Sequence, residues 1–342
     1  MIKENLKKNS FDILKYWAAF SVMFLHYTYY AFVEAEQAWE FMDKLRKISE
    51  FFPGVVVLFT ISGFLISDSM ERSKSQKDFL RKRVFRLYPE LWLCTIVNLC
   101  VLSVIAKEYL DRSILLWIGT QFFGIANTPS CLDGFATGSV NGALWTILVE
   151  VQLYLIICFG YHKLKKMKMF QWSIFLAALA GVNLLCDYVS SAGGGVVSKL
   201  IERSFFPYTF WFMIGVFCYQ YRNKIIGCLR YLVIPLLILY WFVRPYGMEQ
   251  PGYYVGIGVS ILCPFIVIGL AYLLPAIRFK TDLSYGLFLY HWIVLNIIVH
   301  FELLKQWKWY LCFAFFIVMT IILAWGSRSV IGKIVTMVKN RY

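Results

Sequence analysis

The feature that most constrains the fold of this chain is a succession of apolar stretches, each about 20 residues long, enough to span the hydrocarbon core of a bilayer as an α-helix. Lipid offers no hydrogen bonds to the backbone, and a helix satisfies every peptide group of such a stretch internally. We therefore predict an all-α, polytopic membrane bundle of about ten transmembrane helices. The predicted spans lie near residues 11–33, 52–69, 87–106, 141–161, 170–190, 204–221, 229–243, 253–275, 283–303 and 309–327.

The composition supports this fold class. Of the 342 residues, 60% are hydrophobic and 16% are charged, whereas a soluble domain is roughly half apolar and a quarter charged. The apolar segment 113–125 is too short to cross, so we predict a re-entrant or interfacial position for it. The stretch 229–243 is also short and requires Arg230 to snorkel or the bilayer to thin. No linker or soluble appendage is visible, which predicts a single membrane domain over residues 1–342.

The distribution of basic residues predicts the orientation. With the N-terminus in the cytoplasm, 23 of the 34 Lys and Arg residues fall in cytoplasmic segments and 10 in external ones, while Lys15 lies inside a span. Both termini are therefore expected in the cytoplasm. The net charge of +14 then reflects topology and contact with the inner leaflet rather than a nucleic-acid partner. The nine cysteines show no CxxC spacing, so we expect neither a disulfide nor a metal site.

The first span carries two ionisable residues at membrane depth, Lys15 and His26. Such residues are costly in a bilayer and indicate a functional site by default. Eleven residues separate them, so they share one helix face, and Asp12 lies close to the same stripe. A snorkelling lysine and a buried, hydrogen-bonded histidine remain the alternative.

Two further segments place charged residues at the end of a predicted span or inside one. Arg83 and Arg86 lie three residues apart in a basic run at the cytoplasmic end of the third span, and guanidinium groups so placed suit phosphates. Anchoring to anionic lipid is the alternative. Glu150 lies roughly 13 Å inside the fourth span and His26 roughly 10 Å inside the first, both from the outer end. The carboxylate and the imidazole are therefore predicted to meet in the bundle, unless Glu150 only pairs with a cation.

Two more motifs contain small or polar residues inside spans. Ser62 and the following glycine belong to the segment SGFLIS, where small residues permit close helix packing. His291 lies in the late segment SYGLFLYHW, near the predicted midplane. Considered alone, it is explained by a structural hydrogen bond.

Together these segments resemble the acyltransferase 3 family, whose members move acyl groups, commonly acetyl, onto cell-surface carbohydrates of bacteria. The resemblance spans the chain and is carried by His26, SGFLIS, RKRVFRLYP, NGALWTILVEVQLY and SYGLFLYHW in that order. The family's spacing of a basic residue and a histidine maps onto Lys15 and His26. Its RxxR motif maps onto Arg83 and Arg86, its intramembrane acid onto Glu150, and its late motif onto Ser284, Tyr285 and His291.

The resemblance implies a membrane-bound O-acyltransferase of the bacterial plasma membrane that uses cytoplasmic acyl-CoA, most simply acetyl-CoA, as donor substrate. No bound cofactor is expected; the expected partners are acyl-CoA, a carbohydrate acceptor and the bilayer. An acceptor hydroxyl needs a base, and an imidazole is the best candidate. The implied catalytic residues are His26 and Glu150, the donor-binding residues Lys15, Arg81, Arg83 and Arg86, and the supporting residues Asp12, Ser62, Tyr88, Trp145, Ser284, Tyr285 and His291.

Two other function classes share some of these features. A transporter or flippase of lipid-linked sugars would also have many spans and internal charges, but it more often shows internal repeats or matching broken helices, which the sequence lacks. A membrane module attached to another activity, such as an amino-acid racemase, would need an additional soluble domain. The acceptor sugar, the acyl group and the oligomeric state are left open by the sequence.

Overall fold

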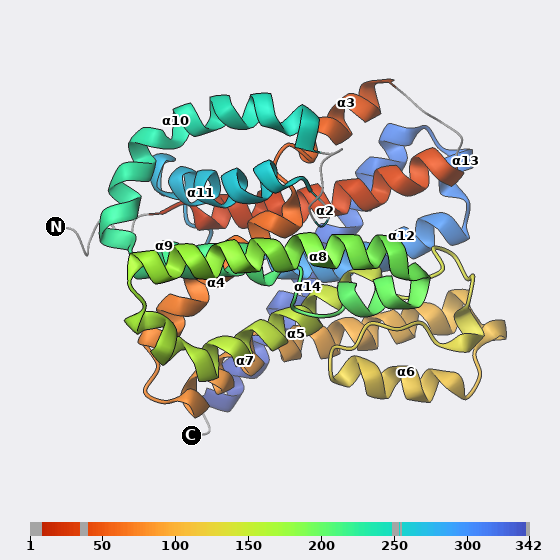
Figure 1. Cartoon of the computed structure of the whole chain (residues 1–342). Coiled ribbons are helices and arrows are strands. Elements are labelled where there is room, and N and C mark those ends of the chain that lie inside the picture. Colours follow the sequence, from red (N-terminus) through yellow and green to blue (C-terminus); the bar gives the residue numbers. More distant parts are fainter. Residues whose placement is uncertain (1–8, 35–39, 248–252, 254, 340–342) are drawn as a thin grey trace. The chain divides into compact units, whose positions relative to one another are not determined.

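The structure is a computed structural model that describes residues 9–34, 40–247, 253 and 255–339 (Figure 1). The regular structure of these residues is helical, and no strand occurs among them. This confirms the all-α prediction. The α-helices are α2 (Phe11–Glu34), α3 (Glu40–Ser49), α4 (Gly54–Glu71), α5 (Gln76–Ile105), α6 (Ser113–Phe122), α7 (Trp145–Lys166), α8 (Met169–Glu202), α9 (Thr209–Gln220), α10 (Arg222–Gly247), α11 (Ile257–Leu273), α12 (Ser284–His300), α13 (Leu303–Gln306) and α14 (Trp309–Lys339). Three 3₁₀ turns accompany them: η1 (Lys107–Tyr109), η2 (Ser130–Leu132) and η3 (Gly142–Leu144).

Six helical segments of the described residues are long and apolar enough to cross a membrane. They are Glu40–Glu71, Gln76–Ile105, Gly142–Lys166, Met169–Glu202, Arg222–Pro245 and Trp309–Lys333. Four further apolar helices, α6, α9, α11 and α12, are shorter. The chain is thus a multi-pass membrane protein by these criteria, while the predicted number of about ten spans stays a prediction.

Three helices can be compared with the segments predicted for them: α2, α10 and α6. The first predicted span forms α2, which is not among the six, since Lys15, His26 and several tyrosines lower its hydropathy. The stretch 229–243 was predicted to be short, but α10 is a helix of 26 residues. The short apolar stretch thus belongs to a longer helix, because the helical backbone continues beyond the apolar core into the basic residues that precede it. The segment 113–125 forms α6, only 10 residues long and too short to cross.

The chain forms two compact units, each assembled from three separate chain segments. Unit 1 comprises Met1–Ala18, Phe52–Arg83 and Val149–Lys280. Unit 2 comprises Ala19–Phe51, Val84–Leu148 and Thr281–Tyr342. The helices α2, α5 and α7 are each divided, with one part in unit 1 and the other in unit 2.

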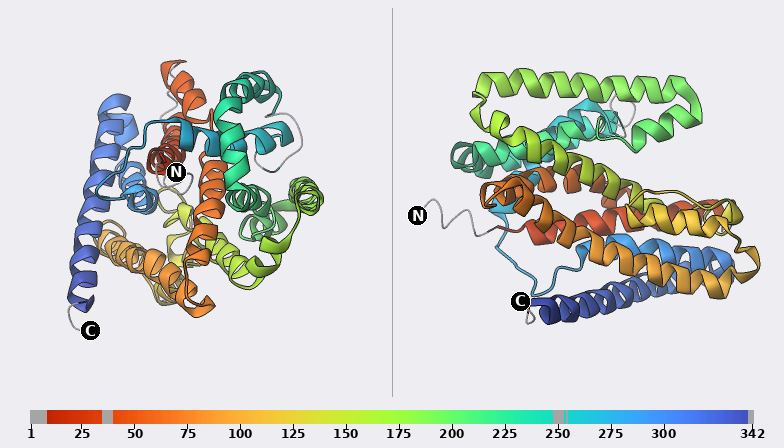
Figure 2. Two further views of the ribbon diagram at one scale, coloured as in Figure 1. Left: turned by 90° about the vertical axis from the view of Figure 1, so that its left-hand side faces the viewer. Right: turned by 90° about the horizontal axis from the view of Figure 1, so that it is seen from below.

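Glycines set the closest helix packing of unit 1. A Cβ on Gly63 of α4 would lie 1.9 Å from the backbone oxygen of Phe212 in α9, and a Cβ on Gly215 would lie 2.1 Å from the oxygen of Thr60. The two backbones therefore touch where only glycine fits, which confirms the packing expected of SGFLIS. In the same unit α8 turns sharply at Gly194, whose φ is 73° (Figure 2).

Unit 2 has its core between α2, α12 and α14. Tyr27, Leu295 and Phe316 are fully buried in one apolar cluster with Met42 of α3. A second cluster joins Leu91 of α5, Ile147 of α7 and Leu289 of α12. Both clusters surround α12, which is buried along most of its length.

Candidate functional site

The predicted site residues of unit 2 centre on a pair of histidines. Nδ1 of His26 lies 2.9 Å from Nε2 of His291, and Nδ1 of His291 lies 2.8 Å from the backbone oxygen of Phe288. His291 has no exposed surface, whereas His26 is only half-buried. The structure thus joins a residue predicted to be catalytic directly to one predicted to support it.

Trp292 forms a wall beside this histidine pair. Its ring meets that of His26 edge to face, with centroids 4.6 Å apart and an interplanar angle of 77°. The Trp292 indole N–H donates to Thr137 Oγ1 (3.0 Å) and to the Ser139 backbone oxygen (2.9 Å). Trp292 therefore couples the position of His26 to the segment that precedes α7.

That segment is held to α12 by amide side chains. Asn296 donates from Nδ2 to the backbone oxygens of Ser139 and Val140, and its Oδ1 accepts from Thr137 Oγ1 at 2.7 Å. Asn141 donates to the backbone oxygen of Leu289, while its Oδ1 accepts from the N–H of Ala143 and so caps the turn that leads into α7. The motif NGALW thus serves to fix the backbone around the histidine pair.

The SY motif of α12 lies against α5. Asp282 Oδ1 accepts from Ser284 Oγ (2.6 Å), and its Oδ2 pairs with Arg86 at 3.1 Å. The Tyr285 hydroxyl donates to the backbone oxygen of Leu87 at 3.2 Å. Ser284 and Tyr285 therefore support the helix that carries Arg86 rather than the histidine pair.

In unit 1, Glu150 of α7 is held by two hydroxyl groups. Its Oε1 accepts hydrogen bonds from Ser62 Oγ, at 3.3 Å, and from the Tyr154 hydroxyl. Ser62 comes from α4 and Tyr154 from the next turn of α7. Ser62 thus contacts Glu150, and its predicted supporting role stays a prediction.

Arg83 continues this cluster. Its guanidinium lies 5.9 Å from the ring centroid of Tyr154 and 5.8 Å from that of Phe79, and Nη2 donates to Ser69 Oγ at 2.9 Å. The Arg83 Nε is buried with no hydrogen-bond partner among the described residues. Arg81, on the same helix, is exposed.

Lys15 and Asp12 form an ion pair in unit 1. Lys15 Nζ lies 2.8 Å from Asp12 Oδ1, and the two side chains are 16% and 27% exposed. Lys15 is thus paired with Asp12, while its predicted part in donor binding stays a prediction. Two other predicted supporting residues lie in unit 2: Tyr88 donates to the Phe123 backbone oxygen at 3.5 Å, and Trp145 packs against the cluster around Leu289.

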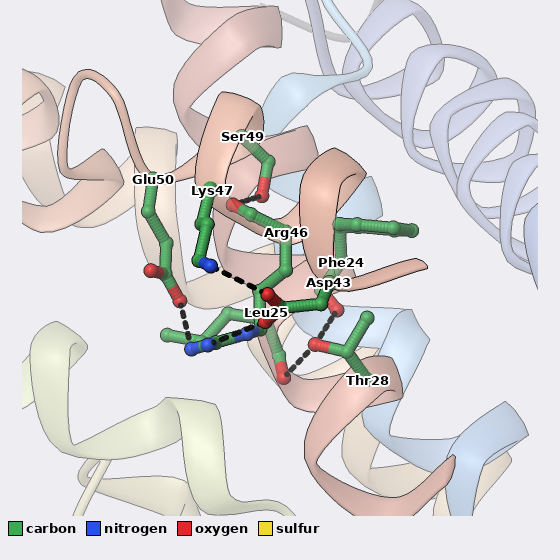
Figure 3. Close-up of polar contacts among 8 residues, drawn as sticks. All are labelled: Phe24, Leu25, Thr28, Asp43, Arg46, Lys47, Ser49 and Glu50. Atoms are coloured by element: carbon green, nitrogen blue, oxygen red, sulfur yellow. Dashed lines mark hydrogen bonds and ion pairs between the residues drawn. The ribbon is translucent and has the colours of Figure 1, made fainter. Parts of the chain in front are cut away.

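A charged cluster on α3 lies beside the helix turn that carries His26. Asp43 pairs with Arg46 (2.9 Å) and Lys47 (2.7 Å), and Arg46 also pairs with Glu50 (3.2 Å). Figure 3 shows these side chains next to the α2 turn with Leu25 and Thr28. The α2 turn at Leu25 and Thr28 thus has charged side chains beside it, a feature that the apolar pattern of α2 did not indicate.

The structure places His26 in unit 2 and Glu150 in unit 1, so their predicted meeting stays a prediction. Sequence reasoning assigned no role to Tyr154, Trp292 or Asp282. Tyr154 follows Glu150 by four residues, and this helical spacing was a usable signal. Trp292 contacts Thr137 and Ser139, and Asp282 pairs with Arg86, all far away in the chain, so no local pattern indicates these contacts.

Comparison with known proteins then decides the family. The family model described as "Acyltransferase domain" (acyltransferase 3) matches residues 8–328. The chain belongs to the acyltransferase 3 family. As an enzyme it is thus an O-acyltransferase.

Two curated relatives of this acyltransferase align over most of their length. "Nodulation protein 10" of Rhizobium leguminosarum bv. viciae is 25% identical over 338 residues, which cover 88% of this chain and 86% of the relative. The "O-acetyl transferase" of Shigella phage Sf6 is 25% identical over 316 residues, which cover 86% of each chain. No solved structure matches the chain.

Proposed function

We propose that this acyltransferase moves an acyl group, most simply acetyl, from cytoplasmic acyl-CoA to a hydroxyl of a cell-surface or exported polysaccharide or glycolipid. The family and the relative named O-acetyl transferase support transfer to oxygen. We place the enzyme in the bacterial plasma membrane with both termini in the cytoplasm, as the distribution of Lys and Arg predicts.

The observation that carries the proposal is the histidine pair. An alcohol is a weak acid, so it needs a base as it attacks a thioester. His26 is half-buried and can meet a substrate, while its other side is held by His291. The acceptor oxygen bonds to the thioester carbon as its proton passes to His26. The C–S bond then breaks, and His26 returns the proton to the thiolate, which gives the ester and free CoA.

The donor is held, in this proposal, by the basic segment at the start of α5. CoA carries phosphates, and guanidinium groups bind phosphate through several N–H donors. Arg86 pairs with Asp282, which orients it, and its side chain is 40% exposed. Arg81 and Arg83 lie on the same helix and complete the donor site.

Binding of labelled acetyl-CoA to the purified enzyme tests the donor site. Arg86→Ala should weaken binding, and Arg86→Lys should restore it only in part because an ammonium lacks the planar fork. Arg112→Ala, an exposed cation between η1 and α6, is the matched control and should bind normally. Normal binding by Arg86→Ala would contradict the donor site.

Proton NMR of surface glycans tests the function as a whole. We compare glycans from the wild-type, a deletion strain and strains with His26→Ala or the control His162→Ala, which alters an exposed histidine of α7. The deletion and His26→Ala should lose an acyl resonance that His162→Ala keeps, at equal protein levels. Loss of a general base typically costs roughly 10²- to 10⁴-fold in rate. An unchanged acyl pattern in the deletion strain would overturn the function.

A further inference from the structure

The two histidines form a hydrogen-bond chain whose direction is set by a backbone carbonyl. Nδ1 of His291 lies 2.8 Å from the Phe288 oxygen, which can only accept, so this nitrogen carries a proton. A neutral imidazole has one N–H, so Nε2 of His291 holds a lone pair. Nδ1 of His26 lies 2.9 Å from that lone pair and must therefore be the donor.

We infer that Phe288 and His291 together fix His26 in the tautomer that carries its proton on Nδ1 and its lone pair on Nε2. The inference rests on the proposed function in one respect: Nε2 is then the atom that takes the acceptor's proton. His291 is a positioning residue, since it has no exposed surface and acts through His26. The hydrogen bond at one ring nitrogen decides which form the other nitrogen takes.

The ring geometry supports a hydrogen bond rather than stacking. The two imidazole planes are only 6° from parallel, while their centroids are 5.2 Å apart and the joined nitrogens 2.9 Å apart. These values fit two rings that meet edge to edge in nearly one plane, where the N–H and the lone pair of an imidazole both lie. Trp292 meets both rings steeply, at 77° and 74°, and restrains their rotation.

The same chain accommodates the charge that catalysis creates. When Nε2 of His26 accepts a proton, Nδ1 keeps its own proton and still donates to the His291 lone pair. No bond of the chain has to break or reverse. His291 thus stabilises the protonated ring through a charge-assisted hydrogen bond, which is stronger than a neutral one.

Nitrogen-15 NMR of the imidazoles tests the tautomers without any activity measurement. The chain has four histidines, so the background His162→Gln/His300→Gln leaves only His26 and His291 to be labelled. We expect a protonated Nδ1 and an unprotonated Nε2 for both residues in the detergent-solubilised enzyme. A His26 that carries its proton on Nε2 would overturn the inference.

Variants of His291 test the positioning role. His291→Phe should lower kcat by roughly 10- to 100-fold, as losses of supporting contacts do, with little change in KM for the acceptor. The nitrogen-15 spectrum of His26 should then show both tautomers. His291→Gln, whose oxygen can accept from His26 Nδ1, should recover part of kcat and the single tautomer. The matched control His300→Phe changes the last residue of the same helix and should keep both. If His291→Gln and His291→Phe show the same kcat and the same His26 spectrum as wild type, the role is excluded.

The catalytic role of His26 and the tautomer of its ring can be contradicted separately. If His26→Ala retains full transfer, the proposed function of His26 is wrong whatever the spectra show. If His26→Ala is inactive but His26 carries its proton on Nε2, the function stands and the tautomer chain is wrong.

Discussion

At the scale of single residues, the Trp292 ring beside the histidine pair leaves no space for a side chain at position 142. A Cβ on Gly142 would lie 2.5 Å from the Trp292 ring, closer than any real contact. The same ring lies against His26 and is tied by its N–H to Thr137 and Ser139. A methyl group at position 142 must therefore move the ring that positions His26.

We predict that Gly142→Ala lowers kcat by roughly 10- to 100-fold, because displacements of about 1 Å have effects of this size. Protein yield should change little, since only one side chain has to shift. Turnover of the purified enzyme is the measurement, with Gly160→Ala as the matched control: a Cβ there meets nothing within 4 Å. Equal turnover by both variants would show that Trp292 does not position His26.

At the scale of helices, the contact between α4 and α9 rests on paired glycines. Gly63 and Gly215 each face a backbone oxygen of the other helix, so an added methyl group meets backbone that cannot rotate away. The helices can accommodate it only by separating, and this also displaces Ser62 from Glu150.

We predict that Gly63→Ala lowers the free energy of unfolding by about 1–3 kcal/mol or more, as overpacking does. Gly181→Ala, on α8 with open space around it, should instead be neutral or stabilising by up to about 1 kcal/mol. Thermal unfolding in detergent measures both. A Gly63→Ala variant as stable as wild type would mean that α4 and α9 do not pack this closely.

The helices themselves were largely predictable, because runs of apolar residues and their length follow from the bilayer alone. The first and last residues of α10 were not predictable, since helical hydrogen bonding continues beyond the apolar residues that the hydropathy pattern detects. The contact of His26 with His291 was not predicted either: 265 residues separate the two, and only tertiary packing brings α2 and α12 together. Glu150 and Tyr154 lie one helical turn apart, so that pair was within reach of sequence reasoning.

At the scale of the whole molecule, the orientation in the membrane determines which substrate reaches which residue. In a Cys-depleted background, we predict that Gln76→Cys reacts with an impermeant thiol reagent only after the cytoplasmic side is opened. Asp133→Cys should react from outside intact cells. Both native residues are exposed, so lack of access would not explain a negative result. Labelling of position 76 from outside would overturn the cytoplasmic donor site.

The division into two units makes the coupling of His26 and Glu150 a property of the whole molecule. His26 has its own support in unit 2, through His291 and Trp292, and Glu150 has its own in unit 1, through Ser62 and Tyr154. Each unit thus holds one catalytic candidate in a fixed position. Two such residues can act in the same catalytic step or independently, and a double-variant cycle distinguishes the two cases.

We predict that Glu150→Gln costs most of the activity, because an amide lacks the negative charge with which a carboxylate stabilises a protonated imidazole through space. If the two residues act in the same step, the double variant should be scarcely slower than His26→Ala. The effects of substituting coupled catalytic residues are strongly non-additive. Turnover of the two single variants and the double variant forms the cycle, and unfolding temperatures check that each is folded. Losses that multiply in the double variant would contradict coupling. Glu150 would then act separately, within the cluster that it forms with Ser62 and Tyr154 in unit 1.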